Sequence, residues 1–458
     1  MSASEQREVA EVESLRQLGV ELSGLLGVKV WEAETNLKLE RMRWLVEAAG
    51  FPYIAYRSVH IGGTSGKGSV ASATSSILSA HGARVGLHLS PFVQTLNETW
   101  QIDGRNVLPS VALQSARALI TSITSVPQPY GLPSYFEFKV ALAFQLFKEL
   151  SVDRAVVEVG LGGMLDATNV LGPGVKLLTN VGLDHVDILG DTVEKIAMDK
   201  VGIFKPNSTV IAGVEQESVR KIVRDECNQT GSHLWLINEN FRIDRVAPEG
   251  LLVELNGKSK IVVKVPPHWQ RYQDVNAGLA LAAAIESADA DLDPERCSAA
   301  LSRVSLPGRV EVFEDSHGTV ILDGAHNEDK LAASFGSVKA RFPGRRCVGV
   351  VALKSGKETQ KIVEILARNL SGVVFTTFDA PPWLCVPTRE LEVLAREIGM
   401  NDIEVQENPK LALERARDLA SDSGIVLVTG SLYLAGNVRS CWIGEAAAAL
   451  RGGSYASV

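Results

Sequence analysis

A glycine-rich stretch after His60 has the residue types and spacing that phosphate binding requires. The apolar run SVHI leads into HIGGTSGKGSV, where four glycines surround Lys67 and Ser69 opens a helix-like segment. Such a loop lets backbone N–H groups approach phosphate oxygens, adds a helix N-terminus and a lysine charge, and leaves a hydroxyl for Mg²⁺. A tight turn with a solvated lysine is the alternative, which the strand before and the helix after the loop disfavour. The predicted phosphate loop comprises Gly63, Thr64, Ser65, Gly66, Lys67, Gly68 and Ser69.

Two further stretches place metal-binding side chains at the ends of apolar runs. Glu158 ends RAVVEVG beside a glycine loop, where a carboxylate is costly unless a cation meets it. Asp184 and His185 follow the strand-like VKLLTNVG, and oxygen plus imidazole ligands suit Mg²⁺ or Mn²⁺. These residues predict a metal site, although a hydrogen-bonded core histidine is the alternative for His185.

The loop GTSGKGS departs from the common GxxxxGK[ST] pattern, because its leading spacing is GxxxGK and Gly68 stands between Lys67 and Ser69. It resembles the loop of folylpolyglutamate and dihydrofolate synthases, within the Mur ligase superfamily, whose usual form is GTNGKGS; Ser65 stands at the Asn position. The resemblance continues along most of the chain, through LHLSPFVQTLNETWQIDGRNV, SYFEFKVALAF, VEVGLGGMLDATNV, TNVGLDHVDILGDTVEKIAMDKVGIFKP, LPGRVEV, LDGAHN and VTGSLYLAGNVR.

The resemblance implies which residues hold magnesium. The family's magnesium ligands match Ser69, Glu158 and His185 in this sequence. Lys200 matches a lysine that takes up CO₂ as a carbamate, which turns a cation into a carboxylate able to hold a second magnesium. On composition alone, Lys200 is a surface helix residue or a functional one at even odds, and Lys205 is equally eligible. The expected cofactors are ATP and Mg²⁺, the latter at two sites.

The resemblance also implies nucleotide and substrate contacts. Asn276 matches the residue that meets adenine, and Arg309 matches an arginine near the phosphates, where a fork of donors suits oxyanions. Asp323 is expected to contact both ATP and the amino acid; like the other LDGAHN and VTGS residues it lies at a strand end, where ligands collect in open α/β sheets. The implied glutamate-binding residues are Asp323, His326 and Ser431, and the implied catalytic residues are Lys67, His185, Lys200 and Arg309.

These parts imply one reaction. A carboxylate is a poor electrophile, so ATP would phosphorylate it to an acyl phosphate while Mg²⁺ and Lys67 offset the charge. An amine then attacks to give an amide, ADP and phosphate. In the family the amine is that of glutamate and the acceptor is dihydropteroate or a folate γ-carboxylate. Domain closure would exclude the water that hydrolyses the intermediate.

The acceptor side departs from the family pattern at three positions. The stretch VWEAETNLKLERM has Asn36 where the family has Asp and lacks its His and Lys, Phe92 replaces the His of an SPH block, and Met164 replaces the Arg of GGRLD. An alternative is therefore a relative that ligates an amino acid to a non-folate carboxylate.

Two other classes of protein are weaker alternatives. A non-catalytic nucleotide-binding protein would need the loop alone, whereas Glu158, His185, Lys200 and the DGAHN block argue for chemistry. A peptidoglycan Mur ligase carries a UDP-sugar domain ahead of the loop, and only 59 residues precede His60.

The elements that must position these residues follow from hydrophobic periodicity. From Tyr53 onward, β-branched runs alternate with helical stretches, which predicts a parallel sheet with crossover helices. Residues 11–49 are predicted to be largely helical, ending at Gly50 and capping the sheet. STVIAGVE, HLWLI and three polar-alternating segments predict a mixed or antiparallel annex. RCVGVVAL, SGVVFTTF and GIVLVTGS predict a second, smaller sheet.

The predicted fold is α/β with two domains. Residues 1–304 form a larger ATP-binding domain of the P-loop type, with a mostly parallel sheet and an N-terminal helical cap. Residues 305–458, after the hinge at Pro307 and Gly308, form a smaller Rossmann-like domain that binds the amino acid.

Composition bounds the class of protein. The 458 residues exceed one ordinary core, and 46 basic against 54 acidic residues give a net charge of −8, which argues against a nucleic acid or membrane partner. Five dispersed cysteines indicate reduced thiols, the acidic N-terminus is unlike a signal peptide, and no apolar run reaches the ~18 residues of a membrane span. We expect a cytoplasmic monomer with small-molecule substrates.

Overall fold

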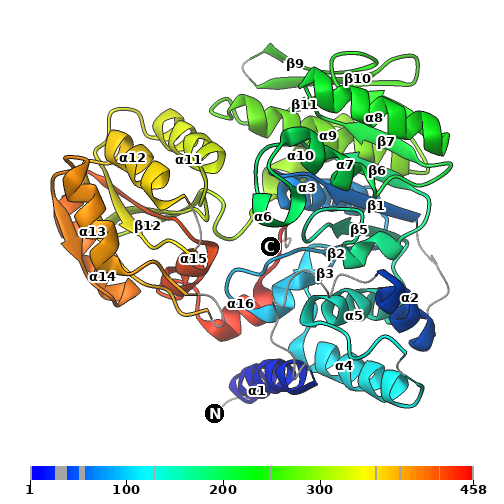
Figure 1. Cartoon of the computed structure of the whole chain (residues 1–458), viewed down its shortest axis with the longest axis horizontal. Helices are drawn as coiled ribbons and strands as arrows, with labels where there is room; N and C mark the ends of the chain where they lie inside the picture. Colours follow the sequence, from blue (N-terminus) through cyan, green and yellow to red (C-terminus); the bar gives the residue numbers. More distant parts are fainter. Residues whose placement is uncertain are drawn as a thin grey trace.

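The computed structural model describes residues 3–25, 39–50, 57–127, 129–247, 249–355, 358–380, 384–421 and 423–455. These residues form two lobes, each built around its own sheet (Figure 1). The large lobe comprises the elements up to residue 303, and the small lobe comprises residues 311–439. The α/β fold with a larger parallel-sheet part and a smaller α/β part is as the sequence predicts.

Eight strands form the main sheet of the large lobe, in the order β4-β3-β2-β5-β1-β6-β7-β8. They are β1 Arg57–Gly62, β2 Val85–His88, β3 Trp100–Ile102, β4 Arg105–Asn106, β5 Arg154–Glu158, β6 Val175–Leu178, β7 Thr209–Ala212 and β8 His233–Leu236. The six strands from β2 to β8 in this order are parallel, and β3 and β4 continue one edge as antiparallel strands. Because β5, β1 and β6 are neighbours, the loops that follow them meet at one edge of the sheet.

Helices cover both faces of this sheet. They are α1 Ala3–Leu25, α2 Leu39–Ala48, α3 Lys67–Ala80, α4 Pro109–Thr124, α5 Tyr135–Glu149, α6 Val186–Leu189, α7 Val193–Val201, α8 Glu217–Thr230, α9 Arg271–Ser287 and α10 Pro294–Arg303, with 3₁₀ turns at Leu96–Thr99 and Ala167–Val170. Helices α3, α9 and α10 pack on one face, and α1, α2, α4 and α5 pack on the other. The strands between them are buried on both sides, which explains their continuous apolar runs.

The annex is smaller than the sequence predicts. Strands β9 Phe241–Ala247, β10 Gly250–Leu255 and β11 Ser259–Lys264 form a separate antiparallel sheet. The runs STVIAGVE and HLWLI, however, contain β7 and β8, which pair in parallel with the main sheet. A short apolar run has the same local pattern in either sheet, so its strand partner decides where it belongs.

The N-terminal helices pack on the large lobe, and α2 ends where Gly50 adopts φ +70°. Arg41 of α2 pairs with Glu137 of α5 at 2.8 Å, and both side chains are buried. Glu137 also closes a capping box with Ser134 at the start of α5. The stretch between the two helices, including the predicted departure at Asn36, lies outside the described residues.

The small lobe holds a six-stranded sheet in the order β12-β13-β17-β14-β15-β16, with only β12 antiparallel. Its elements are β12 Glu311–Asp315, β13 Gly318–Leu322, α11 Glu328–Arg341, β14 Cys347–Val351, α12 Thr359–Asn369, β15 Gly372–Phe375, α13 Thr388–Glu397, β16 Ile403–Val405, α14 Pro409–Ala420, β17 Ile425–Thr429 and α15 Leu432–Arg439. Helices α11, α12 and α13 cover one face, and α14 and α15 cover the other.

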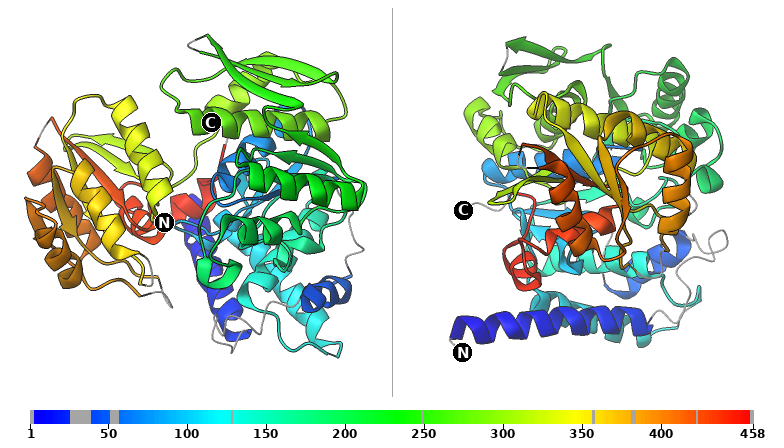
Figure 2. Two further views of the ribbon diagram at one scale, coloured as in Figure 1. Left: turned by 45° about the horizontal axis from the view of Figure 1, so that its top comes forward. Right: turned by 90° about the vertical axis from the view of Figure 1, so that its left-hand side faces the viewer.

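The chain returns to the large lobe after α15. Helix α16 Glu445–Arg451 packs against α1 and β4 (Figure 2). Tyr455 then reaches Ser75 of α3 with a hydrogen bond of 2.6 Å between the hydroxyl oxygens. A boundary between functional domains at residue 305 stays a prediction.

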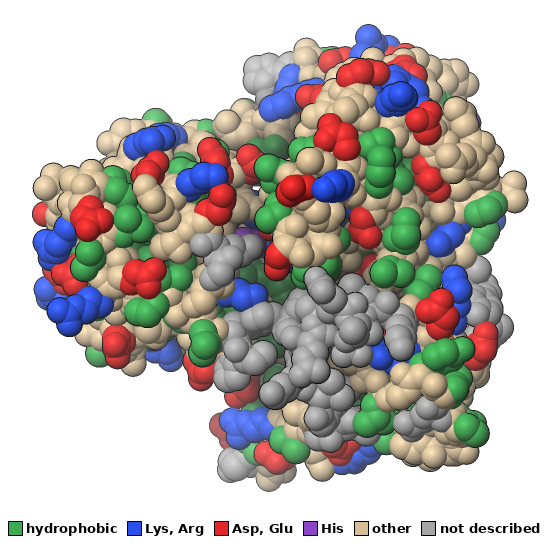
Figure 3. All heavy atoms as spheres, in the orientation of Figure 1, with side chains coloured by type: hydrophobic (Ala, Val, Ile, Leu, Met, Phe, Trp, Pro, Cys, Tyr) green, Lys and Arg blue, Asp and Glu red, His purple; other side chains and the backbone are tan. Residues whose placement is uncertain are grey.

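The surface is hollowed where the lobes meet, and charges of both signs are interspersed over each lobe (Figure 3). None of the described helices is long and apolar enough to cross a membrane.

Candidate active site

The phosphate loop connects β1 to α3, and hydrogen bonds to the loop after β6 hold its shape. The N–H groups of Thr64 and Ser65 donate to the backbone and side-chain oxygens of Asn180, at 3.0 and 2.8 Å. The Thr64 hydroxyl lies 3.2 Å from the carbonyl oxygen of Gly182 and 3.1 Å from its nitrogen. Beyond these contacts, the N–H groups of Lys67, Gly68 and Ser69 lie in the first turn of α3, where a helix offers no backbone acceptor. They remain the donors that suit a phosphate.

Glycine is required at Gly66, which precedes α3 with φ +82°. A side chain there would place its Cβ 2.6 Å from Oδ1 of Asn276, the α9 residue predicted to meet adenine. The structure therefore brings Asn276 against the phosphate loop. Gly68 faces Glu158 instead, with 3.5 Å between an added Cβ and Oε1 of that carboxylate.

Lys67 and Lys200 converge on this loop. Nζ of Lys67 donates to the carbonyl oxygen of Gly63 at 2.9 Å, and Nζ of Lys200 donates to the same oxygen at 3.2 Å. Lys200 is buried at the end of α7, so the sequence-based alternative of a surface lysine is wrong. Burial, together with the nearby charge of Lys67, lowers the pKa of Lys200 to about 7.

Glu158 ends β5 beside the phosphate loop, as predicted, and only 6% of its surface is exposed. Its Oε2 accepts the N–H of Ser90 at 2.8 Å. Burial raises the pKa of this carboxyl group, whereas Lys67 and Arg309 act in the opposite direction through their charges. The charges of Lys67 and Arg309 thus offset part of the cost of burying this carboxylate.

His185 and Asp184 follow β6, and their side chains lie 3.9 Å apart. His185 is half exposed, so the alternative of a core histidine is wrong. The part of the chain that the structure describes contains no group of three or more His, Cys, Asp or Glu side chains arranged to hold a metal ion. Ser69, Glu158 and His185 offer a hydroxyl, a carboxylate and an imidazole, and their assignment as Mg²⁺ ligands stays a prediction; Mg²⁺ needs few protein ligands when phosphate oxygens supply others.

Arg309 joins the two lobes electrostatically. It lies in the linker before β12, and its charge acts on the carboxyl groups of Glu158 in the large lobe and Asp323 in the small lobe. A pocket opens at this point, next to the phosphate loop. Its lining residues come from both lobes: Gly68, Leu89, Ser90, Pro91, Phe92, Val93, Glu98, Gln101, Glu158, Leu306, Pro307, Arg309, Leu432, Gly453 and Ser454.

The residues predicted to bind glutamate follow β13 and β17, which are neighbouring strands. Asp323 is buried, and its carboxylate accepts the N–H groups of Val310 and Ala325 at 2.9 and 3.0 Å. Burial raises the pKa of this carboxyl group, which those hydrogen bonds and Arg309 counteract. The hydroxyl of Ser431 caps α15 through the N–H of Tyr433. Asp323 and Ser431 therefore also organise the backbone.

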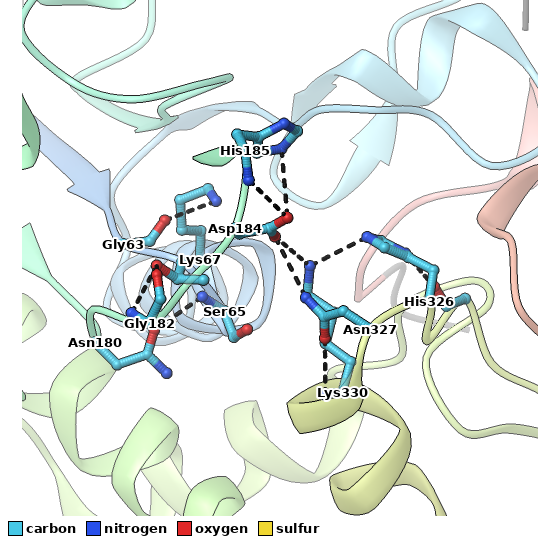
Figure 4. A network of polar contacts seen from close by, with 12 residues as sticks. Gly63, Ser65, Lys67, Asn180, Gly182, Asp184, His185, His326, Asn327 and Lys330 are labelled. Atoms are coloured by element: carbon cyan, nitrogen blue, oxygen red, sulfur yellow. Dashed lines mark hydrogen bonds and ion pairs between the residues drawn. The ribbon is translucent and has the colours of Figure 1, made fainter. Parts of the chain in front are cut away.

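Figure 4 shows residues that sequence reasoning did not single out. Asn180 shapes the phosphate loop, and Lys330 of α11 reaches Asp184 in the other lobe at 3.0 Å. Asn180 stands in the quoted block TNVGLDH, but nothing local marked it. Lys330 lies four residues after His326, in the first turn of α11, whereas His326 precedes the N-cap residue Asn327.

On the acceptor side, Phe92 lines the pocket, whereas Met164 is half exposed. Behind Phe92 lies Lys139 of α5, whose ammonium is 5.7, 5.0 and 5.9 Å from the ring centroids of Phe92, Tyr135 and Phe136. Burial lowers the pKa of Lys139 to about 8. No carboxylate among the described residues pairs with it. The apolar replacement at position 92 is thus accompanied by a buried cation.

Two protein-family models match this chain, one in each lobe. Residues 61–279 match the Mur ligase middle domain, and residues 308–432 match the Mur ligase glutamate ligase domain. The dihydrofolate synthase/folylpolyglutamate synthase of Mycobacterium tuberculosis is 30% identical over 94% of each chain. The protein of the same description from Bacillus subtilis is 29% identical over 88% of this chain and 94% of its own.

A solved structure extends this similarity to three dimensions. The folylpolyglutamate synthase of Mycobacterium tuberculosis complexed with ADP and AMPPCP superimposes with a TM-score of 0.83 at 30% identity, covering 94% of this chain and 98% of the other.

Proposed function

Because this chain belongs to the folylpolyglutamate synthase/dihydrofolate synthase family of Mur ligases, we propose that it joins glutamate to a folate or dihydropteroate carboxylate. It is an ATP-dependent ligase that forms ADP. The observation that carries the proposal is the convergence of Lys67, Glu158 and Arg309 between the phosphate loop and the LDGAHN loop of the small lobe.

The side chains divide the reaction between the lobes. Lys67, on the phosphate loop, offsets the charge of the phosphoryl group as it moves to the acceptor carboxylate. Arg309 stands at the linker, where its donors suit the oxygens of the same group. Asp323, His326 and Ser431 would hold glutamate on the small lobe, so its amine attacks the acyl carbon from that lobe. The leaving phosphate then departs as the amide forms.

Mg²⁺ would be held by Ser69, Glu158 and His185, where it supplies positive charge to the phosphates. We propose that Lys200 carries a carbamate, which adds a carboxylate for a second magnesium. A carbamate forms from the neutral amine, and burial favours that neutral form by lowering the pKa of Lys200 to about 7.

The acceptor occupies the pocket that contains Phe92, Glu158 and Arg309, because its carboxylate must reach the phosphate loop. The replacement of a family histidine by Phe92 favours a second candidate, a ligase for a non-folate carboxylate. Small-molecule substrates follow from either reaction. A monomeric state, a cytoplasmic location and the lack of a nucleic acid partner stay predictions.

One assay separates the candidates. The protein is incubated with ATP, Mg²⁺ and glutamate, and dihydropteroate, dihydrofolate and tetrahydrofolate are offered separately while ADP and ligated mass are followed. Glutamate-dependent ADP release with an added glutamyl mass on one of these acceptors supports the proposal. ATP binding without turnover on any of them would contradict it.

A further inference from the structure

Lys330 occupies an electrostatically unfavourable place. It lies in the first turn of α11, where the helix dipole is positive, and its side chain is only 24% exposed. Its ammonium also lies near the cations Lys67 and Arg309, and burial lowers its pKa to about 8. A lysine at this position does not stabilise the helix. The reason for its presence must therefore lie in the contacts of its side chain.

Its two side-chain partners belong to different lobes (Figure 4). Nζ of Lys330 lies 3.0 Å from Oδ2 of Asp184 in the large lobe and 3.2 Å from Nε2 of His326 in the small lobe. Nδ2 of Asn327 lies 3.5 Å from the same oxygen of Asp184. The ammonium therefore bridges the loop that shapes the phosphate site and the imidazole assigned to glutamate.

The hydrogen bonds fix which nitrogen of His326 carries the proton. Nδ1 lies 2.8 Å from the carbonyl oxygen of Gly324, which can only accept, so Nδ1 carries hydrogen. The ammonium of Lys330 can only donate, so Nε2 presents its lone pair. His326 is thus held as the neutral Nδ1–H tautomer, and the second nitrogen's partner sets that choice.

We propose that Lys330 is a positioning residue for the amino-acid substrate, because it orients the neutral Nδ1–H form of His326 and ties that imidazole to Asp184. The assignment rests on the proposed function, which makes His326 a glutamate contact. Without the ammonium, Nε2 loses the donor that favours the Nδ1–H tautomer, and the imidazole loses its link to Asp184. Glutamate binding should then weaken while the nucleotide site, built on other residues, is preserved.

The test compares three variants with the full-length enzyme. Lys330→Met removes the ammonium and keeps much of the chain length, Lys330→Arg keeps a cationic donor, and Lys339→Met changes an exposed lysine of the same helix that contacts Asn369. We expect Lys330→Met to raise the KM for glutamate about tenfold or more, as small misplacements of binding groups do. Lys330→Arg should recover part of this loss, and Lys339→Met should match wild type. ADP affinity should change less than about twofold in all three.

A spectroscopic readout tests the tautomer directly. In ¹⁵N-histidine-labelled protein, with the His326 signal assigned through His326→Gln, wild type should show a protonated Nδ1 and an unprotonated Nε2. Lys330→Met should lose that pattern. A wild-type His326 protonated at Nε2, or a Lys330→Met enzyme with wild-type KM for glutamate, would overturn the assignment. Failure of the proposed function looks different, since the wild-type enzyme would then ligate glutamate to no acceptor.

Discussion

The ammonium groups of Lys67 and Lys200 share one acceptor, the carbonyl oxygen of Gly63, at 2.9 and 3.2 Å. Two lysines from different elements therefore meet at the start of the phosphate loop. Their mutual repulsion helps to lower the pKa of Lys200 to about 7. Burial is the larger cause of that shift, so the amine of Lys200 loses its proton more easily than an exposed lysine does.

Lys67→Ala should abolish ligation and leave the fold intact, because the ammonium serves the transferring phosphoryl group. One preorganised electrostatic contact commonly contributes on the order of 10²–10³ in rate. ADP release and the thermal unfolding midpoint would be measured together. Wild-type turnover in the folded variant would remove the assignment of the phosphate loop.

Lys200→Ala should be nearly inactive and should recover partly when acetate is supplied, because acetate replaces the carboxylate of the proposed carbamate. The matched control is Lys205→Ala, at the half-buried lysine that the sequence left equally eligible. Ligation rates are compared with and without added acetate and in CO₂-depleted buffer. Full activity of Lys200→Ala in CO₂-depleted buffer would end the carbamate hypothesis.

Glu158→Gln should bind nucleotide but require more Mg²⁺, by about tenfold or more, because the variant loses the charge of a proposed metal ligand. The amide can still accept the N–H of Ser90, so the fold should persist. Magnesium titrations of the ligation rate at saturating ATP give the shift. An unchanged midpoint would show that the carboxylate is structural.

Gly66→Ala should weaken nucleotide binding, because its methyl group would lie 2.6 Å from Oδ1 of Asn276 and the residue has φ +82°. Gly82→Ala is the control: Gly82 has φ +91° and nothing within 4 Å of an added Cβ. Each variant should lose about 1 kcal/mol of stability through backbone strain. Only Gly66→Ala should raise the Kd for ADP, and equal affinities in the two variants would contradict the contact.

Lys139→Met should raise the free energy of unfolding at pH 7 by about 1–3 kcal/mol, since a lysine pKa lowered from 10.5 to about 8 reflects a costly buried charge. The contacts with aromatic rings offset part of that cost. Below pH 8 the native lysine is charged and the cost is full. Between pH 8 and 10.5 the unfolded chain binds more protons than the native one, so wild-type stability rises with pH.

Denaturant unfolding of wild type and Lys139→Met at pH 7 and pH 9.5 measures this difference. The gap between the two proteins should narrow at the higher pH. A Lys139→Met variant that is less stable than wild type at pH 7 would contradict this prediction. It would show that the contacts of the ammonium contribute more than the burial of its charge costs.

Local patterns were sufficient for the parts of the site that depend on neighbours in the chain. The phosphate loop, the strand that ends at Glu158 and the strands of both sheets follow from glycine spacing and continuous apolar runs. The same reasoning misplaced β7 and β8, because a short buried strand carries no mark of its partner. Local sequence constrains the backbone angles φ and ψ and the hydrophobic period. These determine whether a segment forms a helix or a strand before its packing is known.

The tertiary structure alone decided which distant residues meet. Lys200 is separated from Gly63 by 137 positions and Lys330 from Asp184 by 146, and no periodicity relates such positions. Their proximity depends on strand order in the large sheet and on how the small lobe docks against it. The buried state of Lys200 depends on packing within the large lobe, and the tautomer of His326 depends on contacts within the small lobe, because burial and hydrogen-bond partners are properties of the folded chain.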